Sequence, residues 1–344
     1  MKNALKILAL MHPSVVPPDT LAGYTEKEIH AWKTEYDVVS TLRKLGHEVR
    51  PLGVQYELAP IRDAVAAFEP DVVFNLLEEF HQEPALDYSV PAYLELLRIP
   101  YTGCNPRGMM ISRGKALSKQ LLAYHRIHVP HFAVFPRSRK IRRPARLAFP
   151  LIVKSLIADA SVGIARASVV DSDAKLAERV GFIHERIGTD AIAEEYIAGR
   201  ELYVGVLGNN RLTVLPTWEL EFGNLPPDAP QIATERIKHD IEHQDRMGIL
   251  QGPAENLPPG VESRIAPLTR RIYRTLEIDG YARIDYRLSA SGKLYFLEAN
   301  PNPEIAEREE FASSAEHAGI SYPELLSRIV RLALSRSTAG WGTD

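Results

Sequence analysis

A paired-strand segment in the last quarter of the chain constrains the fold most. Residues 280–304, GYARIDYRLSASGKLYFLEANPNPE, read as two strands joined by a Ser-Ala-Ser-Gly turn. Side chains two positions apart share one face of a strand, so Arg283 lies with Asp285, and Glu298 lies with Asn300. If the pairing is centred on the turn, Arg283 faces Glu298 and Asp285 lies diagonal to it. One face of the hairpin therefore gathers two carboxylates, an amide and a guanidinium.

The chemistry of this face favours a metal bound together with a nucleotide. Apolar residues alternate with the polar ones, so the strands are at least half buried, and buried carboxylates are costly without a counter-charge. One arginine offsets only part of that cost. Oxygen ligands of this kind suit Mg²⁺ held partly by protein and partly by phosphates. The alternative is a surface hairpin with a solvated polar face, so the rest of the chain must supply a nucleotide site.

Composition bounds the class of protein. The 344 residues are enough for two or three domains, and the 45% hydrophobic and 25% charged fractions are ordinary for a soluble globular protein. A net charge of -3 gives no electrostatic case for binding nucleic acid or an anionic membrane. The single cysteine, Cys104, excludes a disulfide framework and suits a reducing cytoplasm. The N-terminal run reads as a strand rather than a signal peptide, and no apolar run is long enough to cross a membrane.

The first third of the chain alternates strands with helices. The unbroken apolar strand at 71–77 is typical of a parallel sheet covered on both faces. We therefore expect a doubly wound α/β domain over residues 1–108. The expected strands are 5–11, 47–51 and 71–77, and the expected helices are 26–45, 59–68 and 91–97.

The pattern changes after residue 108. Short strands and single helices indicate antiparallel α+β structure, which we divide into a central unit, 109–194, and a C-terminal unit, 195–336. The stretch 222–250 is rich in proline and charge and is a candidate lid. Residues 337–344 are expected to form a tail, with the last ten residues disordered. The expected strands of the central unit are 131–135, 150–155, 164–170 and 191–196, and its expected helices are 114–125 and 174–187.

Two lysines stand where an anion could bind. Lys154 ends a strand and is followed by a small-residue turn, Ala160 to Gly163, in which backbone N–H groups could converge on a phosphate. The alternative is a purely structural connection. Lys115 begins a helix, where its charge opposes the helix dipole, so it either points to water or serves an anion.

The strand end at 194–197, Glu-Glu-Tyr-Ile, is followed by Glu201. The backbone of such an edge can read the hydrogen-bonding edge of adenine, and a carboxylate a few positions on can accept hydrogen bonds from ribose. The alternative is a charged strand terminus and turn.

In this order, the segments resemble the ATP-grasp superfamily and, within it, the D-alanine–D-alanine ligase family. The resemblance runs from about Asp71 to Leu334. It implies an ATP-grasp fold, in which an N-terminal α/β domain precedes two α+β subdomains that sandwich ATP. It also implies ATP with Mg²⁺, or Mn²⁺ in its place, and a homodimer. The segments that carry it are RIPYTG, GKALSKQLL, FPLIVKSLIADASVGIARA, IAEEYIAGRELYVGVLG, GYARIDYRL, LYFLEANPNP and AGISYPELL.

The resemblance also implies a role for each matching position. Those that contact ATP phosphates are Lys115, Lys154, Ser161 and Gly163. Those that contact adenine and ribose are Glu194, Glu195, Tyr196, Ile197 and Glu201. The implied Mg²⁺ ligands are Asp285, Glu298 and Asn300. Arg283 matches the arginine that stabilises the acyl phosphate and the tetrahedral intermediate, and Lys238 matches a substrate-loop lysine near the γ-phosphate.

The chain departs from the family where substrates bind. Ala160 replaces the first serine of the phosphate loop, the glycine-rich motif after the first strand is absent, and residues 75–79 replace a His-Gly motif. Glu304 stands where the family has a glycine that cradles the second D-alanine. Our hypothesis is that the second substrate is an amine-bearing or larger amino compound, read partly by Glu304, Glu307 or Glu78. The alternative is that these acids are solvated loop charges.

The leading interpretation is a carboxylate–amine ligase that uses ATP and Mg²⁺ to join amino acids or small amino-acid-like compounds through an acyl phosphate. Small-molecule carboxylates and amines would be its partners. Three alternatives remain open: D-alanine–D-alanine ligase itself, an ATP-grasp phosphotransferase, and a nucleotide-binding protein without turnover.

Overall fold

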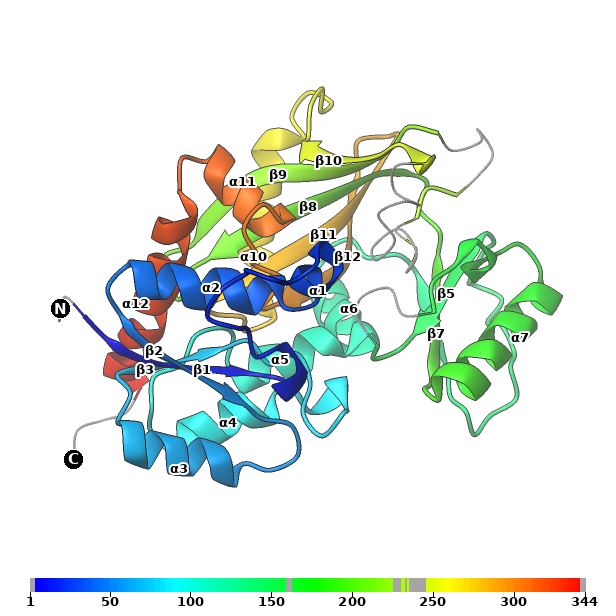
Figure 1. The fold of residues 1–344 in the computed structure, drawn as a ribbon. Helices are drawn as coiled ribbons and strands as arrows, with labels where there is room; N and C mark the ends of the chain where they lie inside the picture. Colours follow the sequence, from blue (N-terminus) through cyan, green and yellow to red (C-terminus); the bar gives the residue numbers. More distant parts are fainter. Residues whose placement is uncertain (1–3, 159–162, 225–229, 233, 235–245, 341–344) are drawn as a thin grey trace.

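The computed structural model describes residues 4–158, 163–224, 230–232, 234 and 246–340. Within these ranges the named strands form sheets of three, five and four strands (Figure 1). No helix in the described part is long and apolar enough to cross a membrane.

The three-stranded sheet is parallel, with the order β2-β1-β3. Successive residues of its central strand enter different cores, Ile7 and Ala9 on one face and Leu8 and Leu10 on the other. Helices therefore cover both faces, as expected for a doubly wound arrangement (Figure 1). The strands are β1 (Lys6–Met11), β2 (Glu48–Gly53) and β3 (Val72–Asn75). The covering helices are α2 (Lys33–Lys44) and α12 (Tyr322–Gly340) on one face, and α3 (Ala59–Phe68) and α4 (Ser89–Leu96) on the other.

The helix expected over 26–45 is two helices, α1 (Glu26–Ala31) and α2. The break lies at Trp32, whose φ of -133° and ψ of 25° are not helical. Its indole is buried between the rings of Tyr24 and Tyr36, with centroids 5.4 and 5.8 Å away. Aromatic packing thus overrides the helical periodicity. The neighbouring 3₁₀ turns are η1 (Pro13–Val15) and η2 (Pro84–Leu86).

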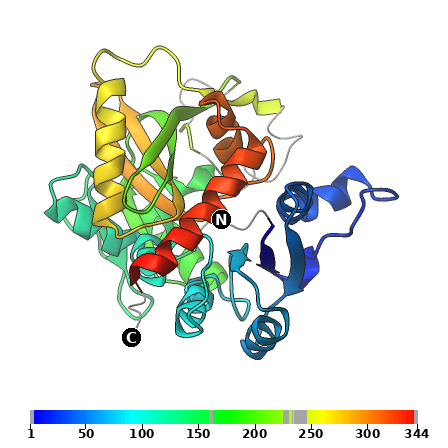
Figure 2. The same cartoon turned by 90° about the vertical axis from the view of Figure 1, so that its left-hand side faces the viewer.

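The five-stranded sheet is antiparallel, in the order β10-β9-β8-β11-β12. One face packs on α10 (Glu262–Thr275) through residues such as Val204 and Ile284, and Figure 2 shows this helix in yellow against the sheet. The opposite face of β8, β11 and β12 carries the polar residues described below. The strands are β8 (Gly199–Leu207), β9 (Thr213–Phe222), β10 (Ile249–Pro253), β11 (Tyr281–Ser289) and β12 (Leu294–Pro301). Neighbouring helices are α5 (Pro106–Arg113), α6 (Lys115–Tyr124) and α11 (Glu310–His317).

The four-stranded sheet has the order β4-β7-β5-β6 and packs on α7 (Asp173–Phe182) and a π-helical turn, η4 (Ile183–Ile187). The prediction of a strand over 164–170 is wrong for most of that range, because only Val169 and Val170 form a strand. Its first part is a 3₁₀ turn, η3 (Arg166–Ser168), because the Ser168 hydroxyl and amide both bond the backbone of Ala165. The strands are β4 (Phe132–Phe135), β5 (Leu151–Ser155), β6 (Val169–Val170) and β7 (Ala191–Glu195).

The end of the described chain is also more ordered than the sequence predicts. Residues 335–340 continue α12 rather than belonging to a disordered tail, and the rest of the predicted tail, 341–344, lies outside the described residues. This helix packs Ile329, Val330 and Ala333 into the core that covers the first sheet, so segments from opposite ends of the chain share one core. Figure 1 shows the red helix beside the blue strands.

Candidate active site

The hairpin pairs in a register that differs from the expected one. Asp285 lies opposite Glu298, and Arg283 lies opposite Asn300, so the predicted pairing of Arg283 with Glu298 is wrong. The register shifts after Asp285, and the extra residue on β12 is Leu297. A β-bulge adds one residue to one strand, which sequence alternation does not reveal. The four polar side chains nevertheless share one face, as predicted.

Asp285 is held by a network of charge-assisted hydrogen bonds. Nε and Nη2 of Arg283 donate to its two carboxylate oxygens at 2.7 and 2.9 Å, and Nδ2 of Asn300 donates at 3.0 Å. Arg283 also donates to Glu310 at 3.3 Å. Burial lowers the pKa of Arg283, but the charges of Asp285 and Glu310 outweigh it and raise the pKa above its ordinary value. The guanidinium is therefore fixed in place and charged.

Strand β8 extends the polar face away from the metal candidates. Its Tyr203 lies opposite Asp285, and the guanidinium of Arg283 lies over the Tyr203 ring, 4.8 Å from the centroid. The Tyr203 hydroxyl donates to Glu201 at 2.9 Å, and Arg287 donates to the other oxygen of Glu201 at 2.7 Å. Glu201, the ribose candidate, is thus buried and neutralised by Arg287.

A second charged cluster belongs to the four-stranded sheet and helix α6. The carboxylate of Glu194, on β7, lies 3.0 Å from Nζ of Lys119 and 3.3 Å from Nζ of Lys154. Lys119 and Glu194 are fully buried, and Lys154 is 8% exposed. Burial alone would raise the pKa of Glu194, but the charges of Lys119 and Lys154 outweigh it and lower the pKa. Glu194 is therefore an ionised carboxylate between two lysines.

The two clusters face each other. Burial lowers the pKa of Lys119, and the charge of Glu298 acts against that lowering. For Lys154 the charges of Glu194 and Glu298 outweigh burial and raise the pKa, so Glu298 lies near both lysines. Lys119 also donates to the carbonyl of Leu297, the bulge residue, and lies 5.6 Å from the ring of Phe296. The candidate phosphate lysine Lys154 and the candidate metal ligand Glu298 thus belong to one polar region between two sheets.

Lys115 reaches the same region from the start of α6. It is only 4% exposed, and its Nζ donates to the carbonyl of Ala158 at 2.7 Å. Ala158 follows β5, the strand that carries Lys154, and precedes the predicted phosphate loop. Lys115 therefore does not point to water; its side chain contacts a backbone carbonyl, and its role in binding an anion stays a prediction.

The remaining candidates have different outcomes. Ser161 and Lys238 lie outside the described residues, so their roles stay predictions. Gly163 is described, with a φ of +70° that favours glycine. Glu195, Tyr196 and Ile197 are half-buried at and after the end of β7, and the Tyr196 hydroxyl bonds the backbone of Gln231.

Sequence reasoning missed Lys119 and Glu310. Lys119 follows Lys115 by four residues and so lies on the same face of the helix, a spacing that would have identified it. Glu310 comes from the start of α11, and no local pattern links it to Arg283.

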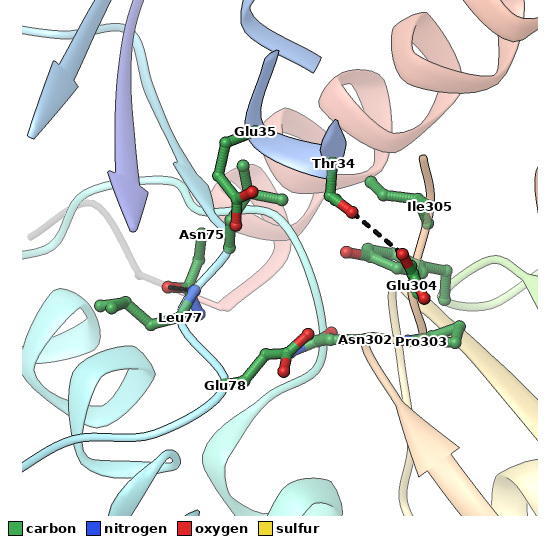
Figure 3. Close-up of a pocket in the computed structure, with 11 residues that line it drawn as sticks. Thr34, Glu35, Asn75, Leu77, Glu78, Asn302, Pro303, Glu304 and Ile305 are labelled. Atoms are coloured by element: carbon green, nitrogen blue, oxygen red, sulfur yellow. Dashed lines mark hydrogen bonds between the residues drawn. The ribbon is translucent and has the colours of Figure 1, made fainter. Parts of the chain in front are cut away.

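Glu78 and Glu304 both line a small pocket beyond the end of β12. Its lining also includes Glu35 of α2, as Figure 3 shows. Burial, together with the charges of Glu78 and Glu304, raises the pKa of Glu35 to about 7. Glu307 is not part of the lining.

Comparisons with known proteins agree with this geometry. A family model described as the D-ala D-ala ligase C-terminus matches residues 121–331. A Sinorhizobium fredii protein named "Uncharacterized protein y4sG" is 32% identical, with 87% of each chain covered. A Desulforudis audaxviator protein named D-alanine–D-alanine ligase is 30% identical, covering 87% of this chain and 92% of that one. The solved structure of a Bacillus anthracis D-alanine–D-alanine ligase complexed with ATP superposes with a TM-score of 0.73 at 22% identity, covering 97% and 99% of the two chains.

Proposed function

Because the chain belongs to the D-alanine–D-alanine ligase family and has its ATP-grasp fold, we propose that it joins a small carboxylate to an amine with consumption of ATP. The observation that carries the proposal is the shared polar region. In it Glu194 pairs with Lys154 of β5 and Lys119 of α6, and Lys119 also donates to the carbonyl of Leu297, the residue before Glu298. Cations placed opposite acids suit a triphosphate bridged to a metal ion.

The donor set fits Mg²⁺. Asp285 and Glu298 occupy directly opposite positions, and Asn300 bonds Asp285 through its nitrogen, which leaves the amide oxygen for another partner. Oδ1 of Asp285 accepts from Arg283, and Oδ2 accepts from both Arg283 and Asn300, so these hydrogen bonds fix the carboxylate beside Glu298. Bound there, Mg²⁺ would neutralise phosphate charge. Asp285, Glu298 and Asn300 would hold it, and Lys115 and Lys154 would hold the phosphates.

Arg283 takes the role of stabilising charge on the reacting group. In the proposed reaction the substrate carboxylate attacks the γ-phosphorus of ATP and releases ADP, and the amine then displaces phosphate from the acyl phosphate. Negative charge accumulates on phosphoryl and carbonyl oxygens in both steps, and a fixed guanidinium stabilises it without reorganising. Hydrogen bonds to Asp285 and Glu310 hold Arg283 in that position.

We also infer that the protein works in the cytoplasm, which suits its single cysteine, Cys104, and that it forms a homodimer, as the family resemblance implies.

The test is ADP release over pairs of carboxylates and amines, with product masses. We expect that ADP release requires both an acid and an amine, and that the product is an amide. A phosphorylated product formed without any amine would indicate a phosphotransferase. Tight ATP binding without turnover would indicate a nucleotide-binding protein. Glu298→Gln is the matched variant, and it should lose release while remaining folded.

A further inference from the structure

The small pocket beyond β12 is acidic on several sides. Its walls are α2, the loop after β3 and the segment after β12. Glu35, Glu78 and Glu304 each come from a different one of these walls, and no lysine, arginine or histidine is among the described residues that line it. Figure 3 shows these side chains around a common space.

The pocket wall is fixed by hydrogen bonds rather than being a loose loop. The Thr34 hydroxyl donates to Glu304 at 3.3 Å, the dashed line in Figure 3. Lys33 donates to the carbonyl of Glu307, and the Glu307 amide donates to Asp37 at 3.0 Å. Lys33 also pairs with Asp37 at 3.3 Å, so this nearby cation already has an acidic partner. Glu304 is therefore held toward the pocket by α2.

Asn75 supplies a second, independent sign of a ligand. It lines the pocket, is only 2% exposed, and its Nδ2 has no hydrogen-bond partner. Its oxygen accepts from the Leu77 amide at 3.3 Å, which fixes the orientation of the side-chain amide. Buried donors are almost always satisfied, so this N–H group calls for an acceptor in the pocket, which a ligand oxygen or a water can supply.

A metal ion does not satisfy both observations. In the described part of the chain, no three His, Cys, Asp or Glu side chains are placed to share a metal ion, so the three carboxylates surround the pocket without converging. An N–H donor directed at the same space also cannot coordinate a cation. An organic ammonium compound with an oxygen acceptor fits both the spread acids and the amide.

The pocket also adjoins the candidate reaction centre. Tyr281 lines it two residues before Arg283, and Asn302 lines it two residues after Asn300. Two residues along a strand span roughly 6.5 Å, so a ligand in the pocket would lie next to the position of Arg283 on the same strand face.

We propose that this pocket binds the amine substrate and selects a small ammonium compound that carries a neutral oxygen acceptor, such as an amino-acid amide or an amino alcohol, over a free amino acid. The proposal rests on the proposed ligase function for its position in the reaction. Glu304 accepts from the ammonium group, the carboxylates of the other two walls add negative potential, and Asn75 donates to the neutral oxygen. A free amino acid would instead place its own carboxylate against Glu304, and like charges in one site are disfavoured.

The test compares matched amines. Alaninamide and alanine, each as D and L forms, are offered as acceptors in the ADP-release assay, and their binding is measured by calorimetry with ADP and Mg²⁺ present. We expect alaninamide to have a KM at least about tenfold below that of alanine. Glu304→Gln should shrink this preference roughly tenfold. Glu307→Gln, which removes a nearby charge outside the pocket, should leave it unchanged.

Asn75→Ala gives an independent arm. This variant should bind alaninamide more weakly than the natural protein does. Its binding of ethylamine, which has no oxygen acceptor, should be unchanged. If Glu304→Gln does not fold, Glu78→Gln serves in its place. Alanine used as well as alaninamide, or a preference that survives both pocket variants, would overturn the proposal while leaving the ligase function standing. Alaninamide that binds through Glu304 and Asn75 but gives no ADP release with any carboxylate of the acid–amine screen would instead support the pocket and refute the ligase.

Discussion

The buried pair of Lys119 and Glu194 offers the sharpest test of the site's electrostatics. Both side chains are fully buried, and their charged atoms are 3.0 Å apart. Lys119→Met would leave Glu194 with Lys154 as its remaining lysine partner, 3.3 Å away, and would leave the Leu297 carbonyl without its donor. Breaking a buried ion pair costs about 3–5 kcal/mol. Because Lys154 remains, we expect a loss of unfolding free energy near the lower limit, about 3 kcal/mol.

Urea denaturation followed by circular dichroism measures this loss. Lys175→Met is the matched control, since Lys175 pairs with Asp171 on the surface at 2.8 Å, and exposed pairs contribute about 1 kcal/mol or less. Adding Glu194→Gln to Lys119→Met should recover part of the loss, because the uncompensated carboxylate is gone. If the free energy of unfolding of Lys119→Met is within about 1 kcal/mol of that of the natural protein, the reasoning about this cluster is wrong.

Three further predictions concern the neighbouring groups. Asp285→Asn should raise the Mg²⁺ concentration needed for half-maximal ADP release by about 10–100-fold, and an unchanged requirement would remove Asp285 from the metal site. Lys154→Met should raise the KM for ATP by roughly tenfold or more, whereas an equal KM would mean that the lysine does not bind phosphate. The pKa of Glu35 is raised from 4.5 to about 7, so the folded state binds this proton more tightly than the unfolded state and loses stability as pH rises through that window. At pH 8 the free energy of unfolding of Glu35→Gln should therefore exceed that of the natural protein by up to about 3 kcal/mol, and at pH 4.5 it should not. If the free energies of unfolding of the two proteins change with pH in parallel, this prediction is wrong.

Local patterns in the sequence predicted the hairpin of β11 and β12 and many other elements, but not β8, which carries Tyr203, or α11, which carries Glu310. The helix over 59–68 has the predicted bounds, and alternation placed Arg283, Asp285, Glu298 and Asn300 on one face. These features depend on residues close together in the chain, whose periodicity is visible in the sequence.

The features that the sequence did not predict depend on contacts between distant segments. The bulge at Leu297 changes the strand register, and its carbonyl is taken up by Lys119, almost 180 residues earlier. The pocket around Glu35 and Glu304 is assembled from three separate segments, joined by a hydrogen bond between residues 270 positions apart. No periodicity within one segment encodes such a meeting.

The packing of α12 on the first sheet bears on how the chain is made. Ile7, Ala9 and Met11 share their core with Ile329 and Val330. As the protein leaves the ribosome, β1, β2 and β3 emerge long before the helix that completes the cover of that face. An apolar surface therefore stays open during most of translation, and such surfaces favour aggregation. Helix α2 emerges early and covers its own part of that face, so the surface that waits for its cover is the part that α12 buries.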